Sequence, residues 1–203
     1  MLRRLFVLVL SIILTSCGGA EKIYAPIDQV VARAYVHGGQ PTLTLFTVIS
    51  NSGDKGAHTS LMINGSQRVI WDPAGSFKHT SAPERGDVLF GITPQMLDTY
   101  IDYHARKRYR VVEQVLPVSA AVAEQALRIA QSEGPQGNAT CSLSTSRLLS
   151  GLPGFDGFPV SYFPKKTMVA FAAKGASRRV IFDDDDSQDA ALMRFPGRHA
   201  TQP

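Results

Sequence analysis

The stretch HTSLMINGSQRVIWD (residues 58–72) holds two short apolar runs that are joined by the letters NGS. Asn-Gly between two such runs is typical of a β-hairpin. A two-residue turn would place His58 opposite Trp71, and Asp72 would then face the other side of the hairpin. A three-residue loop would place His58 directly opposite Asp72. The sequence allows both registers, so it predicts the hairpin and leaves the position of Asp72 open.

Similar runs on both sides of this hairpin extend it into a sheet. We expect strands over 42–49, 58–63, 67–72 and 109–116, and a further short strand in VLFGI (88–92). Capping residues and helical spacing predict four helices: one after Thr93, one between Ser119 and Gly134, one from Cys141, and one in PKKTMVAFAAKG (164–175). The expected fold class is therefore α+β, with a small, mostly antiparallel sheet packed against helices that include the cysteine-bearing one.

The N-terminal sequence MLRRLFVLVLSIILTSCGGA has the three parts of a secretory signal. Arg3 and Arg4 precede an apolar run (5–14) that is shorter than the about 20 residues of a membrane span. The letters LTSC that end at Cys17 resemble the bacterial lipobox, in which the cysteine becomes the lipidated N-terminus. This resemblance implies a signal peptide over 1–16 and a lipidated tether over 17–39. The alternative is an ordinary signal peptide cut elsewhere.

The residues after Cys17 bear on where such a lipoprotein would reside. Two glycines follow the cysteine and no aspartate stands at the second position, which by resemblance to known sorting patterns favours the outer membrane. We therefore expect a protein that is anchored to the bacterial outer membrane through lipid at Cys17 and faces the periplasm. More than one acyl chain is needed for stable anchoring of this kind.

The mature chain would have 203 − 16 = 187 residues, which suits one domain and a monomer. Without Arg3 and Arg4, the 21 basic residues become 19 against 17 acidic ones, a net charge of +2. No basic stripe alternates with aromatics, so nucleic acid is not an expected partner. The segment 183–203 contains four consecutive aspartates, and we interpret it as an acidic, disordered tail rather than a metal site.

Cys141 would be the only thiol of the mature chain, and it stands at the predicted start of a helix after capping-type residues. The unpaired N–H groups and the dipole of a helix N-terminus favour an anion, and the thiolate is the nucleophilic form of cysteine. A free cysteine is also often a small buried hydrophobe. Both interpretations of Cys141 are open from its own position.

A nucleophilic cysteine needs a base, and the chain offers five histidines: His37, His58, His79, His104 and His199. His58 is the preferred candidate because it opens a strand at the edge of the hairpin. His104 ends the apolar stripe of a predicted helix, so we expect it to be structural. Asp72 is the candidate to orient the imidazole of His58.

The order of these parts resembles the circularly permuted branch of the NlpC-like, papain-fold hydrolases, an order shared by the lecithin retinol acyltransferase group. The matching pieces are GAHTSLMI, VIWDPAGSF and ATCSLSTSRLL, with FGITPQMLDTYIDYHA between them, within roughly residues 40 to 175. Acyltransferase relatives carry a second histidine about a dozen residues after the first. Here that position holds Ile70, so Asp72 would have to substitute.

The resemblance implies a permuted papain-like domain over 40–182 with Cys141 as nucleophile and His58 as base. It further implies a thiol hydrolase or acyltransferase that acts on peptide, amide or ester bonds, including those of cell-wall peptides and lipids, without a cofactor or metal. Two alternatives remain: a non-catalytic envelope lipoprotein that uses the fold as a binding module, and a structural lipoprotein in which Cys141 is part of the core.

Overall fold

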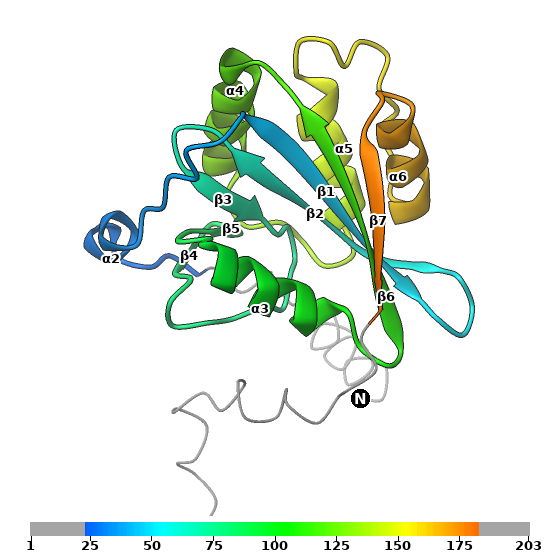
Figure 1. Ribbon diagram of the computed structural model, residues 1–203, viewed down its shortest axis with the longest axis horizontal. Helices are drawn as coiled ribbons and strands as arrows, with labels where there is room; N and C mark the ends of the chain where they lie inside the picture. The colour runs from blue at the N-terminus through cyan, green and yellow to red at the C-terminus, as the bar shows by residue number, and fades with distance from the viewer. Residues whose placement is uncertain (1–22, 183–203) are drawn as a thin grey trace, which may run out of the picture.

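The computed structural model describes residues 23–182 and shows one seven-stranded antiparallel sheet with helices on both faces (Figure 1). The predicted lipid site at Cys17 and the acidic segment 183–203 lie outside the described residues. The strands run in the order β4 (Glu84–Arg85), β5 (Val88–Leu89), β3 (Arg68–Trp71), β2 (Gly56–Asn64), β1 (Thr42–Ser50), β6 (Tyr109–Pro117) and β7 (Ser177–Phe182). The helices are α2 (Ile27–Ala32), α3 (Pro94–His104), α4 (Ala120–Glu133), α5 (Cys141–Ser150) and α6 (Pro164–Ala172).

The prediction of an α+β fold with an antiparallel sheet is confirmed, since every pair of neighbouring strands is antiparallel. All four predicted strands of the sheet and all four predicted helices are present. The sequence analysis did not predict β7. Its first three residues are exposed and it pairs only with β6, so little apolar alternation marks it as a strand.

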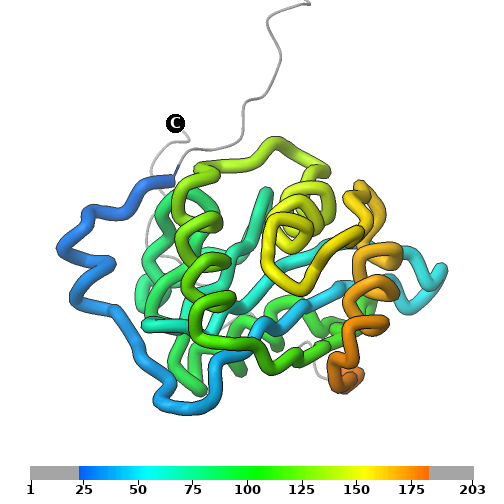
Figure 2. Tube along the Cα trace, turned by 90° about the horizontal axis from the view of Figure 1, so that it is seen from above, coloured from blue at the N-terminus to red at the C-terminus, as the bar shows by residue number. Residues whose placement is uncertain are grey.

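Alternation along the central strands gives the sheet two apolar faces. Odd-numbered residues of β2 such as Leu61 and Ile63 pack under α4, α5 and α6, together with Trp71 of β3. Even-numbered residues such as Met62 and Ile70 pack under α3 on the opposite face. Figures 1 and 2 show α4, α5 and α6 in a row on one side of the sheet. Consequently a residue of β2 points to α3 or to α5 according to whether its number is even or odd.

The register of the central hairpin differs from both registers that the sequence analysis considered. Leu61 pairs with Trp71 and Asn64 pairs with Arg68, and this register, if extended, would set Asp72 opposite Ser60. The loop between Asn64 and Arg68 is held from outside the hairpin, because Glu124 of α4 accepts hydrogen bonds from the backbone N–H and the hydroxyl of Ser66. A contact with a distant helix therefore fixes a register that the turn residues alone leave open.

Two helix starts have the predicted side-chain caps. Thr93 Oγ1 accepts a hydrogen bond from Met96 N at 3.2 Å, and Ser119 Oγ accepts one from Val122 N at 3.3 Å. Helix α5 does begin at Cys141, but the capping predicted for it is absent, since the Thr140 hydroxyl donates instead to Gly137 O at 2.6 Å. The first N–H groups of α5 are therefore not used by a capping side chain, and they remain for the sulfur beside them.

The segment before β1 is attached to the domain from Ile23 onward. Gly86 N donates to Ile23 O at 2.9 Å and Ala25 N donates to Glu84 O at 2.8 Å. Val30 of α2 is buried in the core under α4. Among residues 23–182, no helix has the length and apolar character needed to cross a membrane.

Candidate active site

The candidate site lies where β3 stops pairing with β2. Pairing between these strands ends at Trp71, so His58 and Thr59 lie on a part of β2 that has no β3 partner. Beyond Trp71 the chain turns to β5, and Asp72 N donates to Asp87 O at 2.8 Å. The N-terminus of α5 occupies the open edge, because the backbone N–H of Thr59 is hydrogen-bonded to the sulfur of Cys141.

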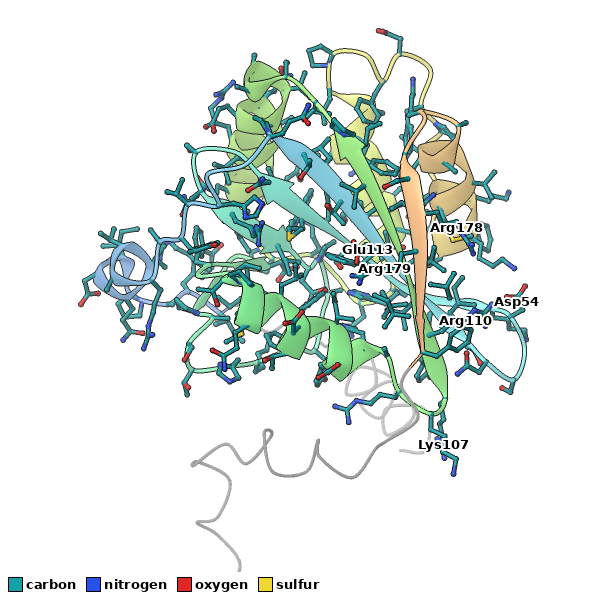
Figure 3. All side chains as sticks on the ribbon, in the orientation of Figure 1. Asp54, Lys107, Arg110, Glu113, Arg178 and Arg179 are labelled. Atoms are coloured by element: carbon teal, nitrogen blue, oxygen red, sulfur yellow. The ribbon has the colours of Figure 1, made fainter. Side chains whose placement is uncertain are left out.

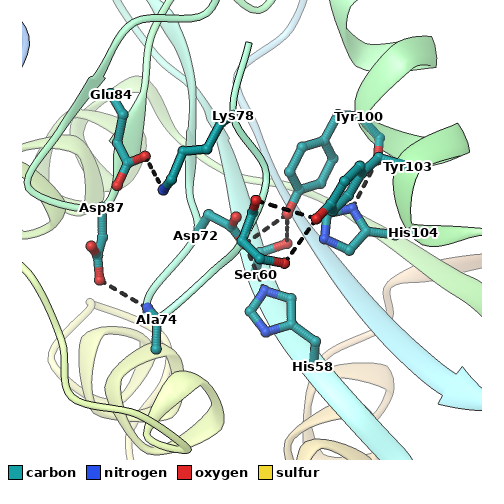
Figure 4. Close-up of polar contacts among 11 residues, drawn as sticks. His58, Ser60, Asp72, Ala74, Lys78, Glu84, Asp87, Tyr100, Tyr103 and His104 are labelled. Atoms are coloured by element: carbon teal, nitrogen blue, oxygen red, sulfur yellow. Dashed lines mark hydrogen bonds and ion pairs between the residues drawn. The ribbon is translucent and has the colours of Figure 1, made fainter. Parts of the chain in front are cut away.

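His58 and Asp72 form a short, largely buried pair. His58 Nε2 lies 2.6 Å from Asp72 Oδ1, and their side chains are 16% and 4% exposed. Tyr100 of α3 donates its hydroxyl to the same carboxylate oxygen at 2.9 Å and lies 2.7 Å from Ser60 Oγ (Figure 4). His58, Ser60 and Asp72 thus meet on the α3 face of the sheet, which is the face expected for even-numbered residues of β2.

Cys141, the first residue of α5, lies beside His58 of β2. The imidazole lowers the pKa of the thiol through its charge and its hydrogen-bonding group, and Cys141 is 8% exposed. Because Nε2 of His58 is engaged by Asp72, Nδ1 is the ring nitrogen left for the sulfur. The structure therefore brings the three residues Cys141, His58 and Asp72 together at one site.

Charges at this site shift the pKa of each of the three residues. Burial alone would raise the pKa of the Cys141 thiol, but the hydrogen bond and positive charge of His58 and the N–H groups of Thr59 and Ser142 lower it below its usual value. Burial alone would lower the pKa of His58, yet the carboxylate of Asp72 and the thiolate raise it to about 10. Both shifts favour the thiolate–imidazolium form of the pair over its neutral form.

Asp72 is the anion that stabilises this state. Burial would raise the pKa of its carboxyl group, but the charge and hydrogen bond of His58, with the hydrogen bond from Tyr100, lower it. The loop that follows closes tightly over the carboxylate. A Cβ built on Gly75 would lie 1.9 Å from Asp72 Oδ2. Only a residue without a side chain fits at this point.

The buried carboxylate of Asp87 holds that loop from behind (Figure 4). Asp87 Oδ2 accepts hydrogen bonds from Ala74 N at 2.9 Å and from Gln136 N at 2.8 Å. Burial raises the pKa of Asp87 despite these bonds. Asp87 therefore links the loop over Asp72 to the segment that leads into α5, and it stabilises the positions of both segments.

His104 is a site residue that the sequence analysis interpreted as structural. Its ring stacks on that of His58 with centroids 5.6 Å apart and an interplanar angle of 6°. Its Nδ1–H donates to Tyr100 O at 2.8 Å, and burial lowers its pKa to about 4, so the ring is neutral. Tyr100 and His104 are four residues apart and therefore lie on the same face of α3. This spacing of two polar residues is the sequence feature that could have indicated their place at the site.

A cavity of about 400 Å³ opens beside His58. Gly75, Tyr103, His104 and Arg106 line it, and its walls come from the loop over Asp72 and the C-terminal end of α3. The guanidinium of Arg106 is held by Tyr103, since its Nε donates to Tyr103 O at 3.1 Å and its charge lies over the Tyr103 ring. His58 thus borders a cavity that is large enough for a small-molecule ligand.

Three ligand-type side chains at this site lie close enough for a metal ion. One ligand atom each from His58, Asp72 and His104 can be chosen such that all three lie within 4.8 Å of one another. In the described structure, however, His58 and Asp72 already share a hydrogen bond of 2.6 Å. That bond is the arrangement required for orienting a base, so we assign the group to proton transfer rather than metal binding.

The other histidines of the described residues do not join the site. His79 lies in the loop after the hairpin, where its Nδ1 accepts a hydrogen bond from Ser81 N at 3.0 Å. His37 is exposed in the segment before β1. Comparison with known proteins adds no relative: no family model, curated protein or solved structure matches the chain.

Proposed function

We propose that this protein is an envelope thiol hydrolase or acyltransferase of a permuted papain-like fold. The observation that carries the proposal is the meeting of Cys141, at the N-terminus of α5, with the hydrogen-bonded pair of His58 and Asp72. A nucleophile, a base and a group that orients the base are the parts of covalent catalysis at a carbonyl. The fold part of the proposal is supported by the order of these parts along the chain, with the histidine strand before the cysteine helix.

The chemistry follows from the charges of the pair. The Cys141 thiolate attacks the carbonyl carbon of an amide, peptide or ester bond, and the electron pair of the carbonyl moves onto oxygen. N–H groups in the first turn of α5, which no side chain caps, stabilise that oxyanion. The His58 imidazolium then protonates the leaving amine or alcohol, and a thioester on Cys141 remains.

The second half of the reaction regenerates the thiolate. Neutral His58 takes a proton from water, or from the hydroxyl or amine of an acceptor, as that group attacks the thioester carbonyl. Attack by water gives hydrolysis, and attack by another acceptor gives acyl transfer. Asp72 keeps its charge throughout and holds the ring so that Nδ1 faces the sulfur.

Thiol alkylation tests the site without knowledge of the substrate. In a Cys17→Ser background Cys141 is the only thiol, and we expect iodoacetamide to modify it at about pH 6, where an ordinary thiol of pKa about 8.5 reacts slowly. His58→Ala should lower the rate by at least about tenfold, because the imidazolium stabilises the thiolate. Asp72→Asn should lower the rate less, since it acts through His58.

Two controls make this test decisive. His37→Ala removes an exposed histidine outside the site and should leave the rate unchanged. Cys141→Ala should abolish the labelling. If His58→Ala and His37→Ala give the same rate as the parent chain, the nucleophile is not activated, and the fold serves as a binding module instead.

The cellular part of the proposal is a lipid anchor at Cys17 that holds the domain at the outer membrane, facing the periplasm. The basic, apolar and lipobox-like parts of the N-terminal sequence support it. In cells fed labelled palmitate, we expect incorporation into the parent chain and none into Cys17→Ser. Equal incorporation into both chains would contradict the anchor and would leave the proposal for Cys141 intact.

A further inference from the structure

One surface of the described domain combines exposed large apolar side chains with lysines. On α6 and the loop before it, Tyr162, Phe163 and Val169 are 60%, 62% and 64% exposed, and Val160 is 49% exposed. We call these four residues, with Lys166 and Lys174, the α6 surface. The outward side of α6 carries Phe163, Lys166 and Val169 at helical spacing, while Thr167 and Phe171 are buried on the inward side. The exposed apolar residues therefore lie on the outward side of α6 and on the loop that leads into it.

Between Asp156 and Asp183, the segment that contains this patch has basic residues and no acidic ones. Residues 157–182 contain five basic residues and no acidic one. Lys165 pairs with Asp54 and Arg179 pairs with Glu113, and Figure 3 shows Asp54, Glu113 and Arg179. Lys166 and Lys174 form no ion pair within the described residues. Lys166 instead lies over the Phe163 ring at 5.1 Å. Lys174 donates to Gly154 O at 2.9 Å and lies over the Phe155 ring. The patch thus presents aromatic rings together with the exposed cation of Lys166.

The α6 surface lies next to the proposed catalytic site. On its buried side α6 contacts the first turn of α5, where Thr167 Oγ1 lies 2.8 Å from Oγ of Ser142, the residue after Cys141. Pro164 closes against β2, because a Cβ built on Gly56 would lie 2.7 Å from Pro164 Cβ. Figure 1 shows α6 beside α5 at the end of the helical row. A body seated on this surface would therefore lie close to Cys141 and His58.

The composition of the α6 surface fits an anionic bilayer better than a protein. Protein interfaces are depleted in lysine, and their buried centres contain few charges. Interfacial helices in contrast place aromatic and aliphatic side chains in the acyl region and lysines at the headgroups, with the lysine stems extending along the apolar surface. Tyrosine is also enriched at the depth of the headgroups. The absence of carboxylates from 157–182 matches the negative charge of such a surface.

We propose that the α6 surface docks on an anionic lipid bilayer and holds the Cys141 site against it. This inference deepens the proposed function and rests on it in one respect: the substrates of the site would be acyl esters or amides that reside in the membrane or at its surface. The docking itself requires no catalytic activity. It is therefore tested by a separate measurement.

The test uses the full chain with a tryptophan introduced by Phe163→Trp. The protein is reconstituted into vesicles of phosphatidylethanolamine and phosphatidylglycerol whose acyl chains carry bromine, which quenches tryptophan on contact. The native Trp71 is fully buried, so the parent chain supplies the background. We expect strong quenching of the introduced tryptophan, and much weaker quenching when neutral phosphatidylcholine replaces phosphatidylglycerol.

A second apolar region provides the matched comparison. Val31 of α2 is 68% exposed beside a cavity of about 430 Å³, far along the chain from α6. Val31→Trp should show little quenching in the same vesicles. Quenching of the tryptophan from Val31→Trp without quenching of that from Phe163→Trp would overturn the proposal, because the bilayer would then contact the α2 side.

Charge reversal separates docking from general proximity to the membrane. Each basic residue near an anionic surface contributes about fivefold to partitioning. Lys166→Glu with Lys174→Glu should therefore lower the quenching of the introduced tryptophan. Arg128→Glu, at an exposed residue of α4, should not lower it. Equal quenching in both charge variants would overturn the proposal. Self-association of the chain that depends on Phe163 and not on lipid would do the same, since the occupant would then be a second copy.

The failure of docking is distinguishable from failure of the catalytic proposal. Alkylation of Cys141 at about pH 6 is measured without vesicles. If docking fails and the thiol stays reactive, the hydrolase proposal stands and only the membrane substrate is lost. If the thiol is unreactive while the introduced tryptophan is quenched, the surface is a membrane-binding site of a non-catalytic protein.

Discussion

At the scale of the residue, the contacts of the Asp72 carboxylate determine the geometry of the site. Asp72 Oδ1 accepts hydrogen bonds from His58 and Tyr100, and the other carboxylate oxygen lies under Gly75. Because the loop over Asp72 leaves no room for a side chain, the carboxylate cannot move outward. The position of His58, and so the charge state of the thiol, depends on this closure.

The first prediction follows from that closure. In Gly75→Ala the new Cβ would lie 1.9 Å from Asp72 Oδ2, so the loop or the carboxylate must shift. We expect a loss of stability of about 1–3 kcal/mol, as for other overpacked sites. We also expect a lower rate of Cys141 alkylation at about pH 6, because the Asp72–His58 bond would be disturbed. Denaturant unfolding and the alkylation rate measure the two effects.

Gly53→Ala is the matched control for this variant. The nearest heavy atom to a Cβ at Gly53 is Lys55 Cγ at 3.9 Å, so a methyl group fits there without movement. This variant should keep the stability and the alkylation rate of the parent chain. If Gly75→Ala behaved in the same way, the loop would not constrain Asp72.

At the scale of the element, the start of α5 is positioned by its neighbours rather than by its own cap. The Thr140 hydroxyl does not cap the helix. The first turn is held instead by the pair of Ser142 on α5 and Thr167 on α6, whose hydroxyl oxygens are 2.8 Å apart in the core. Helix α6 therefore contributes both to the placement of Cys141 and to the α6 surface.

The second prediction concerns this pair. Thr167→Val removes one hydroxyl and leaves that of Ser142 buried without its partner, which should cost about 1–3 kcal/mol of stability. The double variant Ser142→Ala with Thr167→Val should recover part of this loss, because no unpaired hydroxyl remains. Denaturant unfolding of the parent chain, the single variants Thr167→Val and Ser142→Ala, and the double variant gives the coupling energy. Additive losses would show that the two hydroxyls do not interact.

At the scale of the whole molecule, the stack of His58 and His104 makes stability depend on pH. Burial lowers the pKa of His104 from 6.5 to about 4, so the folded protein favours its neutral form. A group with a lowered folded pKa stabilises the fold above the unfolded pKa and loses this contribution as the pH falls. We therefore expect stability to decrease as the pH falls from about 6.5 towards 4.

The third prediction isolates this effect. His104→Phe keeps an aromatic ring against His58 but cannot be protonated, so the free energy of unfolding should fall less steeply with acid between pH 6.5 and about 4. The variant also loses the hydrogen bond to Tyr100 O, which lowers its stability equally at all pH values. Measurement of unfolding across this range should give converging curves. Parallel curves would contradict the titration of His104.

The sequence by itself determined the local elements and the identity of the central residues. Alternating apolar runs predicted β1, β2, β3 and β6, and a thiol at a predicted helix start pointed to Cys141. These features depend on neighbours along the chain, where periodicity and turn residues act. His58 and Asp72 could be chosen for the same reason, as polar residues at the ends of predicted strands.

Only the tertiary structure decided how these residues meet. The hairpin register depends on Glu124 of a distant helix, which holds Ser66, so turn residues alone could not give it. His104 became part of the site because α3 packs on the face of the sheet that carries His58. The sulfur reaches the imidazole because β3 ends at Trp71 and leaves an edge that α5 fills. Each of these contacts joins segments far apart in the chain, and packing rather than local preference selects among the arrangements that a sequence allows.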